Sequence, residues 1–192
     1  MTHFIGDQFM IQNNRELKKE ILTMVVGDIV SSSSLTVKFG AFDAEKTLEW
    51  FVHRVDQQAK THQARFLKFW GDGFIAAFSS PKEAVIFAIE LKNQLANPDF
   101  EGRPLQIIIA IHTSNVAIAS TSYGKEIFGS GVAYAAHLES VGKPGEIIIS
   151  ETARNFIDEI AGTQVVAGGE STVKQLGSVK IFKLVASGEL TK

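Results

Sequence analysis

The sequence predicts an α+β fold in a single domain. Its 192 residues match the usual length of one domain. Hydrophobic residues make up 45% of the chain and charged residues 21%, which provides enough apolar mass for a core and too little charge for disorder. Short apolar runs rich in β-branched residues alternate with longer stretches of helical periodicity, and this alternation indicates that strands and helices are mixed along the chain.

The first part of the chain is predicted to follow the order strand, helix, strand, strand, helix, strand. Buried strands are expected at the apolar runs 21–29, 65–70, 74–79 and 105–112. Helices are expected over 42–63 and from Pro81 onward. The apolar stripe of the first helix consists of Leu48, Phe51, Val52, Val55 and Ala59. That of the second consists of Ala84, Phe87, Ala88, Leu91 and Leu95. This β-α-β-β-α-β order is that of a ferredoxin-like core.

The second part of the chain is predicted to add further strands and helices to that core. Strands are expected at 116–120, 145–150 and 179–185, and helices at 131–140 and 151–160. A Gly-rich stretch at 168–177 is expected to be a loop. We therefore expect an N-terminal leader at 1–20, one domain at 21–186 and a C-terminal tail at 187–192.

Charge and composition exclude several classes of function. The chain has 19 Lys and Arg against 21 Asp and Glu, so it lacks the basic excess of a nucleic-acid-binding protein. It has no cysteine, and therefore no disulfide framework or thiolate metal site. No apolar run approaches the ~18 residues of a membrane span. We expect a cytoplasmic protein with neither a nucleic-acid nor a membrane partner.

Two acidic residues lie at the ends of predicted strands. Asp28 ends the first strand, and Asp72 lies in the turn between the second and third. In a ferredoxin-like sheet the first and third strands are antiparallel neighbours, so we expect the two carboxylates to converge. Taken singly, each could be an ordinary turn or cap residue. Converging carboxylates repel one another unless a cation lies between them, and Mg²⁺ or Mn²⁺ suits such oxygen ligands.

Six segments carry a resemblance to a known family. They are VVGDIV (25–30), FLKFWGDGF (66–74), IAIHT (109–113), EIFGSGVAYAA (126–136), KPGEIIIS (143–150) and the last segment, 173–184. Over about 21–185 the chain resembles the catalytic domain of class III nucleotidyl cyclases, the adenylate and guanylate cyclases. The resemblance implies a reaction in which the ribose 3′-hydroxyl of a nucleoside triphosphate attacks the α-phosphorus and expels pyrophosphate.

The resemblance also implies the residues that bind metal and phosphate. Two ions, Mg²⁺ or Mn²⁺, would be bound by Asp28, Asp72 and the backbone carbonyl of Ile29. The expected phosphate-binding residues are Val30, Ser31, Ser32, Ser33 and Lys174. The serine run is equally explained as a polar turn, and Lys174 as a surface lysine.

Base recognition in adenylate cyclases uses a Lys in Lys-x-x-Gly-Asp and an Asp in Asp-x-x-Gly. Here Lys68 supplies the first, and Glu126 supplies an acid one methylene longer. Guanylate cyclases carry Glu where Lys68 stands, so the resemblance modestly favours ATP.

The sequence departs from the family on the helix that reads Asn-x-Ala-x-Arg. Ala133 and His137 replace the Asn and the Arg, so His137 would have to act as a pH-dependent cation in catalysis. Three interpretations stay open: a slow cyclase, a pseudo-cyclase that binds nucleotide or dimerises, and a pyrimidine cyclase of the kind found in bacterial anti-phage signalling, which makes cyclic CMP or cyclic UMP. Trp50 and Trp70 could narrow a base pocket or pack in the core.

The resemblance finally implies a homodimer. In this family the metal-binding acids come from one subunit, and the base-reading residues and the Asn/Arg helix come from the other. Because this chain carries both sets of positions, two copies would complete two composite sites by two-fold symmetry.

Overall fold

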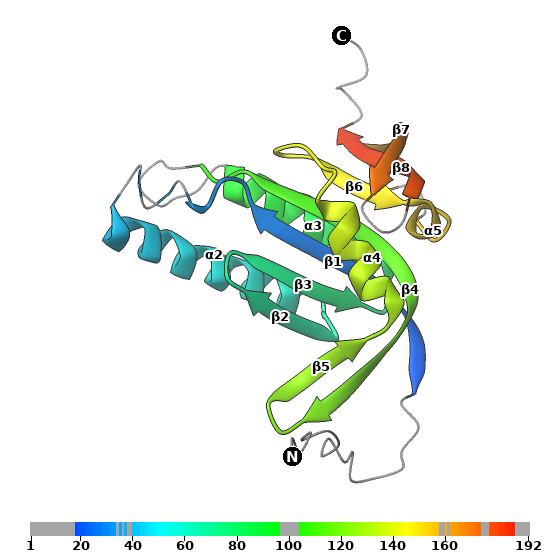
Figure 1. The fold of residues 1–192 in the computed structure, drawn as a ribbon, viewed down its shortest axis with the longest axis horizontal. Coiled ribbons are helices and arrows are strands. Elements are labelled where there is room, and N and C mark those ends of the chain that lie inside the picture. Colours follow the sequence, from blue (N-terminus) through cyan, green and yellow to red (C-terminus); the bar gives the residue numbers. More distant parts are fainter. Residues whose placement is uncertain are drawn as a thin grey trace, which may run out of the picture.

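The computed structural model describes residues 18–33, 35, 37, 40–96, 104–157, 160, 162–173 and 177–186. It confirms the mixed α+β fold (Figure 1). The first six elements are β1 (Lys19–Ile29), α2 (Ala41–Thr61), β2 (Phe66–Trp70), β3 (Gly73–Phe78), α3 (Pro81–Ala96) and β4 (Ile107–Thr121). The remaining elements are β5 (Gly124–Phe128), α4 (Ser130–Glu139), β6 (Ile147–Ser150), α5 (Glu151–Arg154), β7 (Thr163–Val173) and β8 (Gly177–Ala186).

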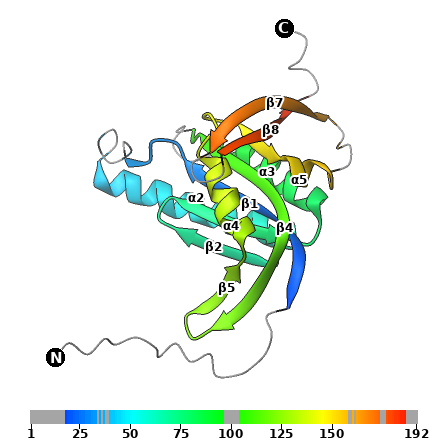
Figure 2. The ribbon, with the colours of Figure 1, turned by 45° about the vertical axis from the view of Figure 1, so that its right-hand side comes forward.

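The strands form one sheet in the order β2-β3-β1-β4-β6-β8-β7, and β5 pairs with β4 beside this path. The first four strands of that order are the ferredoxin-like core, with β1 antiparallel to both β3 and β4. Helices α2 and α3 cover one face of the sheet, and α4 crosses the other (Figures 1 and 2). The two faces therefore have separate apolar layers.

Alternation along β1 divides its side chains between these layers. Val25 and Ile29 pack with α2 and α3, whereas Met24 and Val26 pack on the face that α4 crosses. By the same alternation Asp28 lies on the α4 face. The apolar face of α3 is as predicted, because all five of its predicted residues are buried. The stripe of α2 differs in one position, since Val52 is 36% exposed.

The β4 region corrects the sequence analysis. The two strands expected at 105–112 and 116–120 are one continuous strand, and β5 was not foreseen. The polar interruption at Thr113 does not end the strand, because its buried hydroxyl hydrogen-bonds the hydroxyl of Thr23 on β1 at 2.9 Å. Strand β1 also begins at Lys19, so the last two residues of the expected leader 1–20 belong to the sheet.

The C-terminal part holds two further corrections. The helix expected over 151–160 ends at Arg154. The expected loop 168–177 is strand β7 as far as Val173, paired with β8. Its glycines form a bulge between Ala167 and Gly169, where Gly169 has a φ of +87°. A glycine-rich composition here marks a bulged strand. Among the described helices, none is long and apolar enough to span a membrane.

Candidate active site

Asp28 and Asp72 meet at the ends of β1 and β3. Asp28 pairs with Gly73 across the antiparallel ladder, and the amide of Ile29 donates to the carbonyl of Asp72 at 3.4 Å. Both acidic side chains are half-buried. Burial, and then the charge of Asp72, raise the pKa of Asp28. The structure thus brings together the two carboxylates that the strand order predicts to converge.

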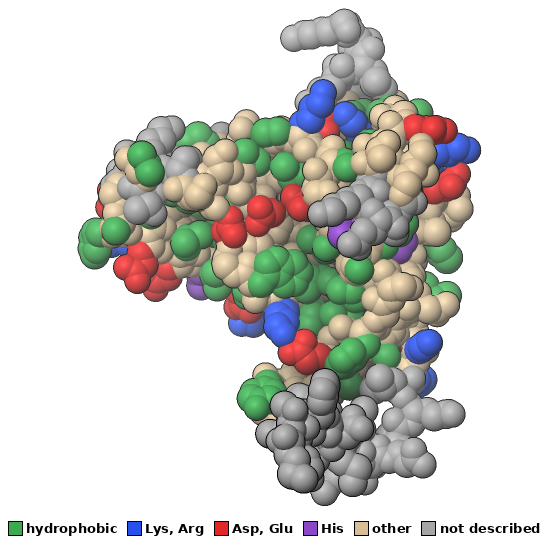
Figure 3. Space-filling model, viewed as in Figure 1, with side chains coloured by type: hydrophobic (Ala, Val, Ile, Leu, Met, Phe, Trp, Pro, Cys, Tyr) green, Lys and Arg blue, Asp and Glu red, His purple; other side chains and the backbone are tan. Residues whose placement is uncertain are grey.

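A third acid, Glu139, lies near this pair and was missed by the sequence analysis. Burial together with the charges of Asp28 and Asp72 raises its pKa to about 7. It is the last residue of α4, and the turn that follows packs onto Ile108, the cross-strand neighbour of Asp28. Acidic side chains gather on this face near the end of β1 (Figure 3). The signal that could have found Glu139 is its position at the end of the helix that crosses the sheet.

This set of side chains has the chemistry of a divalent-cation site. Within the described residues, no Lys, Arg or His forms an ion pair with Asp28 or Asp72, so no described cationic side chain relieves their repulsion. The donors are carboxylate oxygens, which Mg²⁺ and Mn²⁺ prefer. No three His, Asp or Glu side chains of the described part converge closely enough to hold an ion alone. Additional oxygens, such as those of a bound phosphate, are therefore needed.

In the expected phosphate-binding segment, the backbone amide of Val30 already has a partner. Its amide donates to the carbonyl of Gln106 at 2.9 Å, which continues the β1–β4 ladder and leaves no N–H for a ligand. Ser31 and Ser33 are exposed, and Ser32 is partly buried. Ser31 has a φ of +56°, so the chain turns sharply after β1. Lys174 lies outside the described residues.

The two expected base-reading residues contact one another. Nζ of Lys68, on β2, donates to Oε1 of Glu126, on β5, at 2.5 Å. Lys68 is on the same face of β2 as Phe66, which packs in the apolar layer on the α4 side. This ion pair therefore lies on the α4 face of the sheet, the face that also carries Asp28.

Helix α4 carries Ala133 and His137 and packs closely on the sheet. A Cβ at Gly131 would lie 2.5 Å from Cβ of Ser114, so only glycine allows this approach. Ala133 is exposed, and its methyl group can donate no hydrogen bond. His137 is partly buried in the last turn. Of Ala133 and His137, only His137 has a side chain that can carry a positive charge.

His112, in the segment 109–113, is a packing residue in this structure. Its ring is buried, stacks on Tyr134 of α4 at 4.3 Å between centroids, and uses Nδ1 toward the hydroxyls of Ser150 and Thr152. Burial lowers its pKa to about 4, so it is neutral near pH 7. Through these contacts His112, on β4, joins this strand to α4 and β6.

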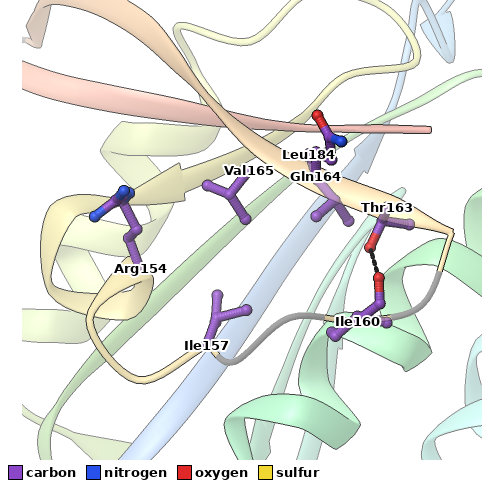
Figure 4. Close-up of a pocket in the computed structure, with 7 residues that line it drawn as sticks. All are labelled: Arg154, Ile157, Ile160, Thr163, Gln164, Val165 and Leu184. Atoms are coloured by element: carbon purple, nitrogen blue, oxygen red, sulfur yellow. Dashed lines mark hydrogen bonds between the residues drawn. The ribbon is translucent and has the colours of Figure 1, made fainter. Parts of the chain in front are cut away.

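A cavity of about 410 Å³ lies elsewhere, between α5 and strands β7 and β8 (Figure 4). Its lining residues are Arg154, Ile157, Ile160, Thr163, Gln164, Val165 and Leu184. None of them belongs to the acidic cluster or to the Lys68–Glu126 pair, so this cavity is separate from the candidate active site.

Residues 15–186 match the family described as the adenylate and guanylate cyclase catalytic domain. The chain therefore belongs to this family. It is 24% identical over 184 residues to a receptor-type guanylate cyclase, gcy-6, of Caenorhabditis elegans, covering 88% of this chain and 17% of that protein. It is 28% identical over 118 residues to a putative adenylate cyclase 3 of Rhizobium meliloti (strain 1021), covering 60% of this chain and 19% of that protein. The chain spans about a fifth of the length of these relatives.

Solved cyclase domains share the fold. The guanylate cyclase domain of RhGC from Catenaria anguillulae, in complex with GTP, has a TM-score of 0.79 at 20% identity, covering 88% of this chain and 98% of that one. A non-canonical dimeric guanylyl cyclase domain from Blastocladiella emersonii has a TM-score of 0.77 at 19% identity, covering 88% and 98%. An adenylate cyclase from Trypanosoma brucei, described in its monomeric state, has a TM-score of 0.78 at 18% identity, covering 85% and 89%.

Proposed function

We propose that this chain is a metal-dependent nucleotidyl cyclase that converts a nucleoside triphosphate to a 3′,5′-cyclic nucleotide and pyrophosphate. The observation that carries the proposal is the convergence of Asp28 and Asp72 on one face, with Glu139 beside them and no described cation to neutralise them. Two Mg²⁺ or Mn²⁺ ions, when bound, would activate the 3′-oxygen and neutralise charge on the phosphates. Asp28, Asp72 and the carbonyl of Ile29 are the protein groups proposed to hold them.

We propose ATP as the modestly favoured substrate. The ammonium group of Lys68 can donate to a ring nitrogen of adenine, and the carboxylate of Glu126 can accept from its exocyclic amine. Their ion pair holds both groups in place before a base arrives. A pyrimidine triphosphate, UTP or CTP, is the alternative substrate, and its cyclic product would connect the chain to anti-phage signalling.

The proposed active form is a homodimer with composite sites. Lys68 and Glu126 lie on the α4 face, where Trp70 and Phe128 are exposed large hydrophobic residues. A second copy packed on this face by two-fold symmetry would cover them and bring its own acidic pair to the first copy's Lys68. Mixing an Asp72→Ala chain with a Lys68→Ala chain tests this arrangement. Partial recovery of activity supports composite sites, and no recovery contradicts them.

The pseudo-cyclase alternative rests on Ala133, whose exposed methyl group cannot orient a ribose. Under that alternative the domain binds nucleotide without turnover. Measured turnover on any of the four triphosphates would reject it.

The direct test incubates the purified protein with Mn²⁺ and ATP, GTP, CTP or UTP separately, and detects the cyclic product by chromatography. Asp28→Ala and Asp72→Ala should each lose activity by about 100-fold or more, the scale of removing a transition-state group. Asp56→Ala is the control, because Asp56 pairs with Lys60 on α2 and belongs to no part of the site. Wild-type turnover in either site variant would contradict the metal assignment.

A further inference from the structure

The outer strands of the sheet border the cavity of about 410 Å³ that lies away from the candidate active site. Helices α2 and α3 pack mainly over β1, β2, β3 and β4, and strands β8 and β7 extend the sheet beyond them. The cavity lies between these outer strands and α5 with the residues that follow it (Figure 4). Its volume is within the range of about 300–1,000 Å³ that is typical of small-molecule pockets.

The lining of this cavity is mainly hydrophobic. Ile157 and Ile160 border it from the segment after α5, and Val165 and Leu184 border it from the sheet. The first three of these side chains are only partly buried. The hydroxyl of Thr163 already has a partner, because it donates to the carbonyl of Ile160 at 3.0 Å. An alkyl chain placed in the cavity would therefore bury apolar surface that folding leaves accessible.

A cationic side chain, Arg154, stands at one end of the cavity, and Thr163 stands at the other (Figure 4). The guanidinium of Arg154 lies over the ring of Phe182 on β8, 4.9 Å from its centroid. Among the described residues, Arg154 has no ion-pair partner, and no Asp or Glu lines the cavity. A guanidinium over an aromatic ring still presents the N–H groups of its edge, which match a carboxylate bidentately.

A second cavity, of about 300 Å³, adjoins the first, because Thr163 and Leu184 line both. It adds the hydrophobic side chains Ile89 and Ile147. Hydrophobic surface thus continues past Thr163, at the end opposite Arg154 (Figure 4). The two cavities together offer a cationic end and an apolar path that leads away from it.

We propose that the first cavity binds a small amphipathic carboxylate, a fatty acid of medium chain length. The carboxylate accepts two N–H groups of Arg154, and the alkyl chain lies against Ile157, Val165 and Leu184. A neutral amphiphile lacks the charge that complements Arg154, and a short carboxylate leaves the apolar lining uncovered. The site shares no residue with the acidic pair or the base-reading pair, so the proposal does not depend on the proposed function.

The binding test adds octanoate to protein labelled with ¹³C in the isoleucine methyl groups and follows these signals by NMR. The signals of Ile157 and Ile160 should shift and saturate, whereas those of Ile118 and Ile127, on the α4 face, should not. Octanol, which lacks the charge, and acetate, which lacks the chain, should each bind at least about tenfold more weakly. Octanol binding equal to that of octanoate, or shifts only outside the cavity, overturns the proposal.

Four variants locate the carboxylate and the chain. Arg154→Gln should weaken octanoate binding by about tenfold or more and change octanol binding little. Val165→Phe fills part of the cavity and should weaken the binding of both. Arg54→Gln is the matched control, because Arg54 also lies over an aromatic ring, that of Trp50 on α2. Lys92→Gln removes the cationic side chain that lines the second cavity and should leave octanoate binding unchanged.

Unchanged octanoate affinity in a folded Arg154→Gln protein overturns the proposal. A larger loss in Lys92→Gln than in Arg154→Gln would place the carboxylate in the second cavity and overturn it as well. A ligand of the folded state should also raise the melting temperature of the wild type, and of Val165→Phe less. Octanoate binding without turnover on any triphosphate would reject the cyclase assignment alone, and turnover without octanoate binding would reject this site alone.

Discussion

Replacing Glu139 by glutamine should change how the stability of the protein depends on pH. The side chain of Glu139 is partly buried near Asp28 and Asp72, and its pKa is raised to about 7 from an ordinary value of 4.5. Burial of the carboxyl group is the main cause of the raised pKa, and the negative charges of Asp28 and Asp72 add to it. Glutamine has nearly the same shape and no charge at any pH, so it removes the cost of ionising the carboxyl group.

The direction in which stability changes with pH follows from how tightly Glu139 binds its proton in the folded and unfolded states. Between pH 4.5 and about 7 the folded protein holds a proton on Glu139 more tightly than the unfolded chain does. The stability that this proton provides is fully present below pH 4.5 and is lost as the pH rises through 7. One pKa unit corresponds to about 1.4 kcal/mol, so the shift sets an upper limit of about 3 kcal/mol. Solvent screening of a partly exposed side chain reduces this to about 1–2 kcal/mol.

The assay is urea unfolding at pH 5 and pH 8, in the absence of divalent ions. Glu139→Gln should match the wild type closely at pH 5 and exceed it by about 1–2 kcal/mol at pH 8. The melting temperature at pH 8 should rise by about 2–8 °C for a chain of this length. Glu49→Gln, at an exposed position on α2, is the control. If Glu139→Gln and the wild type differed in unfolding free energy by the same amount at pH 5 and pH 8, the raised pKa of Glu139 would be refuted.

Three further predictions concern packing and catalysis. Gly142→Ala should lower the unfolding free energy by about 1–3 kcal/mol in urea titrations, because a Cβ would lie 2.4 Å from Cγ2 of Ile108. An unchanged urea midpoint would show that the turn after α4 can shift to accept the methyl group. Thr23→Val or Thr113→Val should each cost about 1–3 kcal/mol by leaving one buried hydroxyl without its partner, and the double variant should cost less than the sum, which a double-variant cycle measures. If the imidazolium of His137 replaces the family's Arg as a transition-state donor, His137→Ala should lower turnover about tenfold and His137→Arg should preserve or raise it. Turnover is measured as a pH–rate profile, and an unchanged rate in His137→Ala would show that the ring only packs.

Part of the site is determined by local sequence and strand order. The β-α-β-β-α-β pattern requires the first and third strands to be antiparallel neighbours, so the convergence of Asp28 with Asp72 follows without coordinates. Helix α3 was equally predictable, since a strong 3.6-residue period leaves one face to bury. Strand β7 was not, because its glycines form a bulge whose pairing with β8 is a long-range property.

The tertiary structure alone decided what surrounds the two aspartates. Glu139 reaches them because α4 lies close on the sheet, an approach set by contacts between residues distant in sequence, such as that of Gly131 with Ser114. The amide of Val30 is engaged because Gln106, the residue just before β4, lies opposite it and accepts its hydrogen bond. Trp70 and Asp28 fall in one cross-strand row only because both pair with Gly73. Composition and periodicity report which face a residue is on, whereas the neighbours on that face depend on strand register and on how closely the helices pack.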